Sequence, residues 1–219
     1  MPRPDSRRTK AAPRDAYHHG ALRDALIEAS ESVLAERGLE GFSLREVARR
    51  SGVSPAAPSH HFGDVAGLLA AVATLAFDGL TAALEAGNAR GGSDPVARLR
   101  EQGVGYVGFA LRYPGRFGLM FRAGLHKDEA LERSAHAAFS ALENAVRALY
   151  GLGPDTPLAP AQWNALLSIW SVVHGFAHLA LAGQFDHFAP RGREAMLRDV
   201  LAPMLEQHLA PYRGDAADR

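Results

Sequence analysis

The sequence predicts an all-α protein, in which an amino-terminal three-helix unit of the helix-turn-helix type is followed by a helical bundle. Three observations lead to this fold class. Apolar residues recur three and four positions apart over long segments, as they do on one face of a helix. Residues that cap or break helices separate these segments. The strict apolar–polar alternation of a half-buried strand is absent from the sequence.

The segment from Ser43 to Phe62 has the pattern of two short helices joined by a tight turn. Ser43 is placed to cap the first helix, and Gly52 breaks it. Ser54 followed by Pro55 gives a second start signal, a cap and then a proline at the first helical position. The first helix carries three apolar residues and three arginines that are expected to face outward: Leu44, Val47, Ala48, Arg45, Arg49 and Arg50. A unit of this kind places its second helix in the major groove of DNA.

The second helix begins with the small residues Pro55–Ala57, which can contact thymine methyl groups. Pro58 falls at about the fourth helical position, where the loss of one amide is tolerated. The polar side chains Ser59–His61 offer hydrogen bonds to bases or phosphates. Alternatively, one of the two histidines belongs to the core and the other to the surface, and Phe62 is expected in the core.

Helical periodicity continues on both sides of this unit. The first long helix is expected from about Ala21 to Arg37, and Asp64 is placed to cap the helix that follows the unit. The run Gly87–Asp94 is expected to be a loop. The further expected helices are Pro95–Arg112, a short one after Pro114, Asp128–Tyr150, Pro160–Ala182 and Arg193–Leu209.

These motifs resemble the TetR family of one-component transcriptional regulators. The runs YHHGALRDALIEASESVL (Tyr17–Leu34), AERGLEGFSL (Ala35–Leu44) and HFGDVAGLLAAV (His61–Val72) are similar to its amino-terminal domain. The run WSVVHG (Trp170–Gly175) is similar to the Trp-His-Gly signature of one carboxy-terminal domain type in this family. The resemblance extends from Tyr17 to about Leu209.

The resemblance implies a DNA-binding domain over residues 17–63 and a ligand-binding and dimerisation domain over residues 64–212. Residues 1–16 are expected to form a flexible basic arm, or else a solvated tail, and residues 213–219 a disordered tail. The residues expected to contact double-stranded DNA are Tyr17, His18, His19, Ser43, Arg45, Ser54, Pro55, Ala56, Ala57, Ser59, His60 and His61.

Two departures from the family pattern weaken the expected grip on phosphates. A tyrosine is usual where this chain has Ser59, and a lysine is usual where it has Val65. Each lost phosphate contact lowers affinity and flattens its salt dependence. The alternative is therefore a TetR-like protein that binds a ligand and has weakened or lost DNA binding.

An aromatic cluster near the Pro95–Arg112 segment is rich enough to wall a cavity for a small molecule. By resemblance, such a pocket takes an effector, here expected to be apolar or aromatic. Trp170 and His174 are expected to offer polar groups to the effector, unless they only fix helix packing. The expected pocket residues are Tyr106, Phe109, Tyr113, Phe117, Met120, Phe121, Trp170 and His174.

The helix Pro160–Ala182 is apolar nearly all round, so it needs cover on both sides. Together with the last long helix it would build the four-helix contact of a two-fold homodimer, and such a dimer predicts a palindromic operator. The expected interface residues are Val172, Gly175, Phe176, Leu179, Met196, Val200 and Met204.

His174 and His178 stand one helical turn apart, which is also the spacing of two metal ligands. A metal-dependent sensor or enzyme is therefore a competing class. However, the chain has no cysteine, no acidic partner in the zinc-protease pattern, and no nucleophile elbow or phosphate loop. The sequence predicts no enzyme activity, no metal site and no cofactor.

The sequence also bears on location. It has no apolar run of membrane-spanning length that is free of charge, and its first twenty residues are basic and polar. We therefore expect a cytoplasmic regulator, most simply a repressor that a small molecule releases from DNA.

Overall fold

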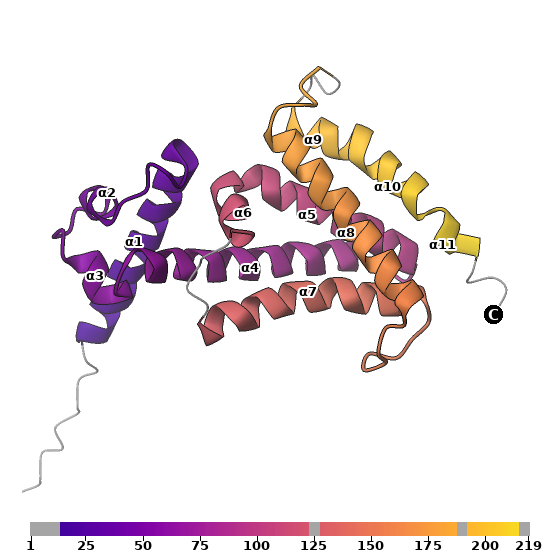
Figure 1. Ribbon diagram of the computed structural model, residues 1–219, viewed down its shortest axis with the longest axis horizontal. Coiled ribbons are helices and arrows are strands. Elements are labelled where there is room, and N and C mark those ends of the chain that lie inside the picture. The colour runs from indigo at the N-terminus through magenta and orange to yellow at the C-terminus, as the bar shows by residue number, and fades with distance from the viewer. Residues whose placement is uncertain (1–13, 123–127, 188–191, 215–219) are drawn as a thin grey trace, which may run out of the picture.

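The protein is an elongated assembly of helices, with the amino-terminal helices at one end and a bundle at the other (Figure 1). The computed structural model describes residues 14–122, 128–187 and 192–214, and it describes only the backbone of residues 14–20, 213 and 214. The helices are α1 (Arg14–Arg37), α2 (Leu44–Arg50), α3 (Ala57–Phe62), α4 (Val65–Arg90), α5 (Pro95–Arg112), α6 (Pro114–Met120), α7 (Glu129–Leu149), α8 (Pro160–Leu181), α9 (Arg193–Met196), the π-helix η1 (Leu197–Leu201), α10 (Ala202–Leu209) and α11 (Pro211–Gly214). The described ranges contain helices and no strand, so the all-α prediction is confirmed.

The amino-terminal domain consists of α1, α2 and α3, which pack on the first half of α4. Leu26 and Val33 of α1 and Val47 of α2 are fully buried. They belong to one apolar cluster with Leu68 and Val72 of α4. The core of this small domain is thus completed by a helix that continues into the rest of the molecule.

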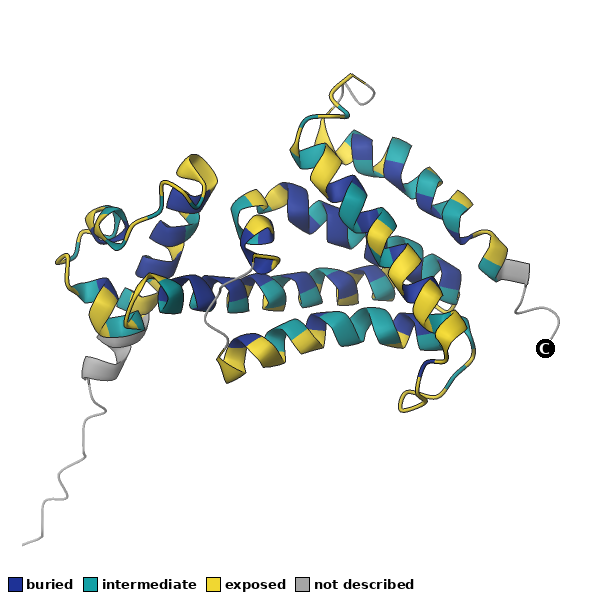
Figure 2. Ribbon diagram, viewed as in Figure 1, coloured by how far each residue is buried: buried dark blue, intermediate teal, exposed yellow. Residues whose placement is uncertain are grey.

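The carboxy-terminal bundle is built around the second half of α4. Helices α5 and α7 run beside α4, and α8 crosses them (Figure 1). Buried residues recur along the whole length of α4 (Figure 2). Ala76, Leu80 and Leu84 of α4 belong to a second apolar cluster that includes the fully buried Phe117 of α6. One helix therefore contributes to both cores.

Three aspartates cap long helices, two of them at the predicted boundaries. The side chains of Asp64, Asp94 and Asp128 accept backbone N–H bonds at 2.8, 2.9 and 2.8 Å respectively. Each satisfies an amide that the first turn of a helix leaves without a partner. The predicted span Pro95–Arg112 agrees with α5 because a cap and a proline mark its start.

The predicted loop Gly87–Asp94 is wrong over its first half, because α4 continues to Arg90. Gly87 is not a helix break. A Cβ atom there would lie 2.5 Å from the backbone oxygen of Glu101, so glycine allows α4 and α5 to approach closely. The first helix also starts earlier than predicted, at Arg14 in place of Ala21.

The last predicted helix, Arg193–Leu209, is interrupted by the π-helical segment η1. Pro203 lacks the amide that would bond to Asp199 and would crowd that residue's carbonyl in a regular helix. The helical turn before the proline contains one extra residue, so that the Ala202 amide bonds to the carbonyl of Leu197, five residues earlier. Proline thus changes the register of the helix without ending it.

Helices α4 and α8 are long and apolar enough, by length and composition alone, to cross a membrane. The core helices of soluble proteins share this property. Both helices contribute residues to the apolar cores of this fold, which accounts for their composition.

We predict that Phe117→Ala lowers the free energy of unfolding by about 3–5 kcal/mol, because it empties a fully buried site. The Phe117 ring packs against Tyr106 and Phe121, with centroids 5.6 and 5.3 Å away. Urea unfolding followed by circular dichroism at constant protein concentration measures the change. Leu75→Ala, at a side chain that is 38% exposed, is the control and should cost less than about 1 kcal/mol. Equal losses for the two variants would contradict this account of the core.

Candidate nucleic-acid interface and internal cavity

The first helix of the helix-turn-helix segment from Ser43 to Phe62, here called the reading unit, forms as the sequence predicts. The Glu46 amide donates to the Ser43 hydroxyl oxygen at 3.3 Å, so Ser43 caps α2. Gly52 follows the helix with φ of +66°, a left-handed conformation that favours glycine. The Val53 amide then bonds back to the Ala48 carbonyl at 3.1 Å and closes the corner.

The second helix begins later than predicted. Its first residue is Ala57, its N-cap is Ala56, and no side chain caps it. Ser54 instead accepts the Ala57 amide with its backbone oxygen at 3.0 Å, so Ser54 and Pro55 belong to the turn. Pro58 is the second helical residue, where the missing amide would have no helical partner. The predicted Ser54 cap and the deeper position of Pro58 are therefore wrong.

The turn and α3 present a small, exposed edge. Ser54, Pro55, Ala56, Ser59 and His60 are exposed, whereas Ala57 and His61 are half-buried. On the inner side Pro58 is buried, and Phe62 is half-buried against the domain core. Side chains of this edge are therefore available to a ligand outside the molecule.

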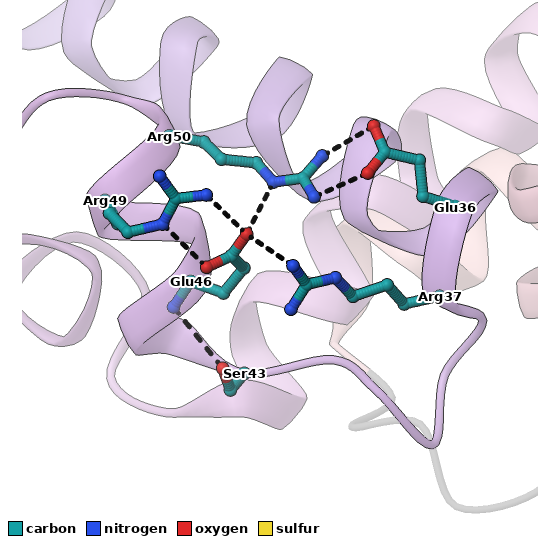
Figure 3. A network of polar contacts seen from close by, with 6 residues as sticks. All are labelled: Glu36, Arg37, Ser43, Glu46, Arg49 and Arg50. Carbon is teal, nitrogen blue, oxygen red and sulfur yellow. Dashed lines mark hydrogen bonds and ion pairs between the residues drawn. The ribbon is translucent and has the colours of Figure 1, made fainter.

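Arg50, expected to face outward, is held inside a network of charged side chains (Figure 3). It donates to both carboxylate oxygens of Glu36, at 2.8 and 2.6 Å, and to Glu46 at 2.9 Å. Its side chain is only 17% exposed. Glu46 also accepts two hydrogen bonds from Arg49 and lies 3.2 Å from Arg37. The network joins α1 to α2 and leaves Arg45 and Arg49 exposed on α2.

The hydrogen bonds from Arg49, and then from Arg50, lower the pKa of the Glu46 carboxyl to about 2 from its ordinary value of 4.5. A carboxyl with a lower pKa in the folded state stabilises the fold above its ordinary pKa. This stabilisation is lost as the pH falls from about 4.5 towards 2.

We predict that Glu46→Gln lowers Tm at pH 7, by roughly a few degrees, and flattens the loss of stability between pH 4.5 and 2. Thermal unfolding across this pH range measures both effects. Glu129→Gln, at an exposed carboxyl paired with Arg133 of its own helix, serves as the control and should behave as the parent protein. A parent-like pH profile for Glu46→Gln would show that the network does not stabilise the domain.

Some expected DNA contacts fall where side chains are not described. Tyr17, His18 and His19 belong to the first turns of α1, and only their backbone lies within the described structure. Residues 1–13 of the basic arm and residues 215–219 of the tail lie outside it. Residues 43–66 include three arginines and two acidic residues, Glu46 and Asp64, so this segment carries only a small positive charge.

The bundle contains a partly open, apolar cavity of about 230 Å³ between four helices. Helices α4, α5, α7 and α8 all contribute to its wall, and Phe121, which follows α6, lines it as well. The lining residues are Phe77, Leu80, Leu84, Leu99, Gln102, Gly103, Tyr106, Phe121, Ala135, Ala138, Phe139, Leu142, Ile169, Trp170 and Val173.

The eight expected pocket residues separate into four groups. Tyr106, Phe121 and Trp170 line the cavity. Phe117 and Met120 are buried in the core beside it. Phe109 and Tyr113 line a separate, more polar hollow of about 570 Å³ that also includes Arg112, Arg116 and Arg193. His174 lies behind the wall and shares a 2.8 Å hydrogen bond with the Tyr106 hydroxyl.

Sequence reasoning missed Gln102 and the contributions of α4 and α7. A signal for Gln102 was present, because Leu99, Gln102 and Tyr106 are spaced to share one face of α5. No comparable signal distinguished Ala135, Ala138 and Phe139 from ordinary core residues of α7. Their place in the wall depends on how α7 packs against α4 and α8.

His174 and His178 lie among aromatic rings and not around an enclosed polar space. Their ring centroids are 4.5 Å apart, and that of Phe117 lies 5.6 and 5.5 Å from them. Burial, and then the charge of His178, lower the pKa of His174. Burial raises the pKa of the Tyr106 hydroxyl. Among the residues that the structure describes, no group of three His, Cys, Asp or Glu side chains is arranged to hold a metal ion.

The expected dimer residues also differ in exposure. Leu179 is 48% exposed, and Val172, Gly175, Val200 and Met204 are half-buried. Phe176 and Met196 are buried within the apolar cluster of their own chain. These two side chains offer little surface to a second subunit.

An exposed helix-turn-helix edge joined through one long helix to a hollow bundle defines a helix-turn-helix DNA-binding regulator. Comparison with known proteins supports this class. The family model described as bacterial regulatory proteins, tetR family, matches residues 26–72. That described as tetracyclin repressor-like, C-terminal domain, matches residues 99–208. The chain belongs to the TetR family of transcriptional regulators.

Individual relatives agree with this assignment. An uncharacterized HTH-type transcriptional regulator of Mycobacterium tuberculosis, Rv0681, is 25% identical over 165 residues, 75% of this chain and 72% of that protein. The HTH-type transcriptional regulator BetI of Burkholderia thailandensis is 40% identical over 78 residues, 36% of this chain and 40% of BetI.

Solved structures share the whole fold. A protein of unknown function from Rhodococcus sp. RHA1 superposes with a TM-score of 0.69 at 32% identity, over 90% of this chain and 97% of that one. The TetR family regulator PfmR from Thermus thermophilus gives a TM-score of 0.62 at 23% identity, over 84% of this chain and 95% of PfmR. The likeness to PfmR shows that the two proteins have the same fold.

The family assignment confirms several predictions from the sequence. The chain is a DNA-binding transcriptional regulator and not an enzyme. Regulators of this family are soluble cytoplasmic proteins that bind DNA as dimers and respond to small-molecule effectors.

Proposed function

We propose that this protein is a repressor that binds a palindromic operator as a homodimer and is released when a small apolar or aromatic molecule enters the α4–α5–α7–α8 cavity. The observation that carries the proposal is the path of α4. Leu68 and Val72 of this helix complete the core of the DNA-binding domain. Phe77, Leu80 and Leu84 of the same helix line the cavity.

The exposed edge of α3 is suited to reading bases. Ala56 and Ala57 offer methyl groups for thymine, and Ser59 and His60 offer hydrogen bonds to base edges. Arg45 on α2, together with the exposed Ser43, is available to neighbouring phosphates, whereas Arg49 is hydrogen-bonded to Glu46. We extend the proposed contacts to the half-buried His61 and, upstream on α1, to Tyr17, His18 and His19.

A second mechanical path runs from the cavity to the reading unit through α6. Phe121, which follows α6, lines the cavity. At the other end of α6, a Cβ atom on Gly115 would lie 3.2 Å from the Ala35 nitrogen, so the backbones of α6 and α1 are in close contact. Arg116 of α6 forms a 2.5 Å ion pair with Glu31 of α1. A ligand that displaces α4 or α6 would therefore move the reading unit as well.

The proposed dimer contact uses the exposed face of α8 beside α10. Val172, Gly175 and Leu179 follow one another at helical spacing, and no atom lies within 4 Å of a Cβ built on Gly175. Val200 and Met204 extend this face from the last helices. Two copies of the α8–α10 pair would form a four-helix contact with two-fold symmetry. Phe176 and Met196 would support it from within each protomer.

The proposal is tested by titrating the purified protein with DNA that flanks its own gene, with random duplex as the comparison, over a range of salt concentrations. Binding to the flanking DNA that is clearly tighter than to random DNA supports a specific operator. His60→Ala should reduce this preference without changing the helical content. No preference at low salt, on the flanking DNA and then on a genomic pool, would indicate a ligand-binding protein that has lost its operator.

We predict that Val65→Lys strengthens operator binding and steepens the slope of log K against log salt by about 0.9, the increment for one further phosphate contact. Val65 is 40% exposed in the first turn of α4, where the family usually carries a lysine. Fluorescence anisotropy at several salt concentrations measures the slope. The matched control is Leu75→Lys, at a 38% exposed site ten residues further along the same helix and away from the reading unit. It should leave the slope nearly unchanged. Equal slopes for Val65→Lys and the parent would place Val65 away from the phosphates.

We predict that Leu179→Arg converts the dimer to a monomer and weakens operator binding by more than about tenfold, since the two half-sites are then no longer held together. The side chain is 48% exposed in the protomer, so the fold should survive. Sedimentation velocity and anisotropy measure the two effects. Leu75→Arg is the control for adding a charge at an exposed leucine. A dimer that persists in Leu179→Arg would place the interface elsewhere.

A further inference from the structure

Gln102 is a buried polar side chain in the wall of an otherwise apolar cavity. It is 4% exposed, and among the described residues only Ser30 is a comparably buried polar side chain. Ser30 is satisfied, because its hydroxyl donates to the Leu26 carbonyl at 2.7 Å. Gln102 is not satisfied, because its Oε1 atom is buried and accepts no hydrogen bond from the residues that the structure describes. A buried acceptor without a partner is costly, so it calls for an explanation.

The orientation of the Gln102 amide follows from its one hydrogen bond. Its Nε2 atom donates to the Ala141 carbonyl of α7 at 3.5 Å. Rotating the amide by 180° would bring two acceptor oxygens together, which is unfavourable. The unpartnered atom is therefore the acceptor oxygen.

The neighbouring groups do not supply the missing donor. The Tyr106 hydroxyl is engaged with His174 at 2.8 Å. Two other buried polar atoms without a hydrogen bond in the described structure, on Glu31 and Arg116, belong to an ion pair between α1 and α6. A water molecule is poorly suited to this place, because it needs two to four polar partners and the cavity wall is apolar.

We propose that the cavity binds an uncharged, largely apolar molecule that carries one hydroxyl or N–H group, and that this group donates a hydrogen bond to Gln102 Oε1. The inference rests on the proposed function, since it specifies the chemistry of the effector in the same cavity. Aromatic and aliphatic side chains would hold the body of the ligand. Gln102 would select alcohols, phenols or amides over hydrocarbons and ethers of the same shape.

The absence of a charged side chain from the described lining excludes ionic ligands from this class. A carboxylate or an ammonium group would lose its hydration without gaining a counter-charge. The hollow near Tyr113, which includes Arg112, Arg116 and Arg193, is chemically different and is not the proposed site.

The test uses three probes of nearly equal shape: 4-ethylphenol, 4-ethyltoluene, which has a methyl group in place of the hydroxyl, and 4-ethylanisole, which has an oxygen but no donor. Ligand-detected NMR titration of the purified protein, without DNA, gives the three dissociation constants. We expect the phenol to bind about tenfold more tightly than either of the others, as one satisfied hydrogen bond predicts. Equal affinities, or no binding of the phenol up to its solubility, would overturn the inference.

Two variants show whether the preference arises at Gln102. Gln102→Met keeps the length of the side chain and removes the acceptor, so it should fold, bind 4-ethyltoluene at least as well as the parent and lose the preference for the phenol. Gln207→Met, at an exposed glutamine of α10, should retain the preference. If Gln102→Met still prefers 4-ethylphenol, the hydroxyl of the phenol must donate to an acceptor other than Gln102.

The outcome separates the inference from the proposed function, because binding is measured apart from DNA. If the phenol binds as expected but operator affinity does not change, the cavity chemistry stands and the proposed release of DNA fails. If the phenol and the toluene bind equally and both weaken operator binding, the proposed release stands and the role of Gln102 fails.

Discussion

Helix α4 is the constraint on which the rest of this structure depends, because its side chains complete two cores at once. Leu68 and Val72 are fully buried among the amino-terminal helices, and Leu80 is buried in the bundle. A close-packed interior transmits displacement, so a shift of α4 in one core is felt in the other. Gly87 extends this constraint, since the close approach that it permits ties the end of α4 to α5. The reading unit and the cavity wall are thus parts of one mechanical element.

The two functional regions differ in chemistry in a way that suits this coupling. The charges of the reading unit are largely engaged with one another, because Glu46 and Glu36 bind Arg50 and hold α1 and α2 in a fixed relation. The unit is therefore expected to move as a rigid body. The described wall of the cavity is almost entirely apolar, with Gln102 as its unsatisfied polar group. The reading unit is stiff and the bundle contains an unfilled cavity. A ligand that fills this cavity is therefore expected to move the reading unit and not to unfold part of it.

Local signals in the sequence were sufficient where one residue decides the structure. The cap and proline at the start of α5 fixed its boundary, and the resemblance of residues 17–72 to a known domain led to the correct family. Local signals were insufficient where the packing of several helices decides the structure. Ser54 has the features of a cap, yet the turn holds it outside the helix. Gly87 has the features of a break, yet its role is close helix packing. The cavity wall combines four helices, so periodicity within any one of them could not identify it.

The most direct test of the account is the distance between the two reading units of a dimer when the cavity is empty and when it is filled. The chain has no cysteine, so Glu28→Cys, on the exposed side of α1, gives one spin label per protomer. Ala138→Phe, on the α7 wall, fills the cavity without requiring a known ligand. Pulsed electron paramagnetic resonance compares the labelled dimer with and without this second substitution. We predict a shifted label-to-label distance and weaker operator binding in the filled protein. An unchanged distance in a folded dimer with Ala138→Phe would contradict the claim that α4 couples the cavity to the DNA-binding domain.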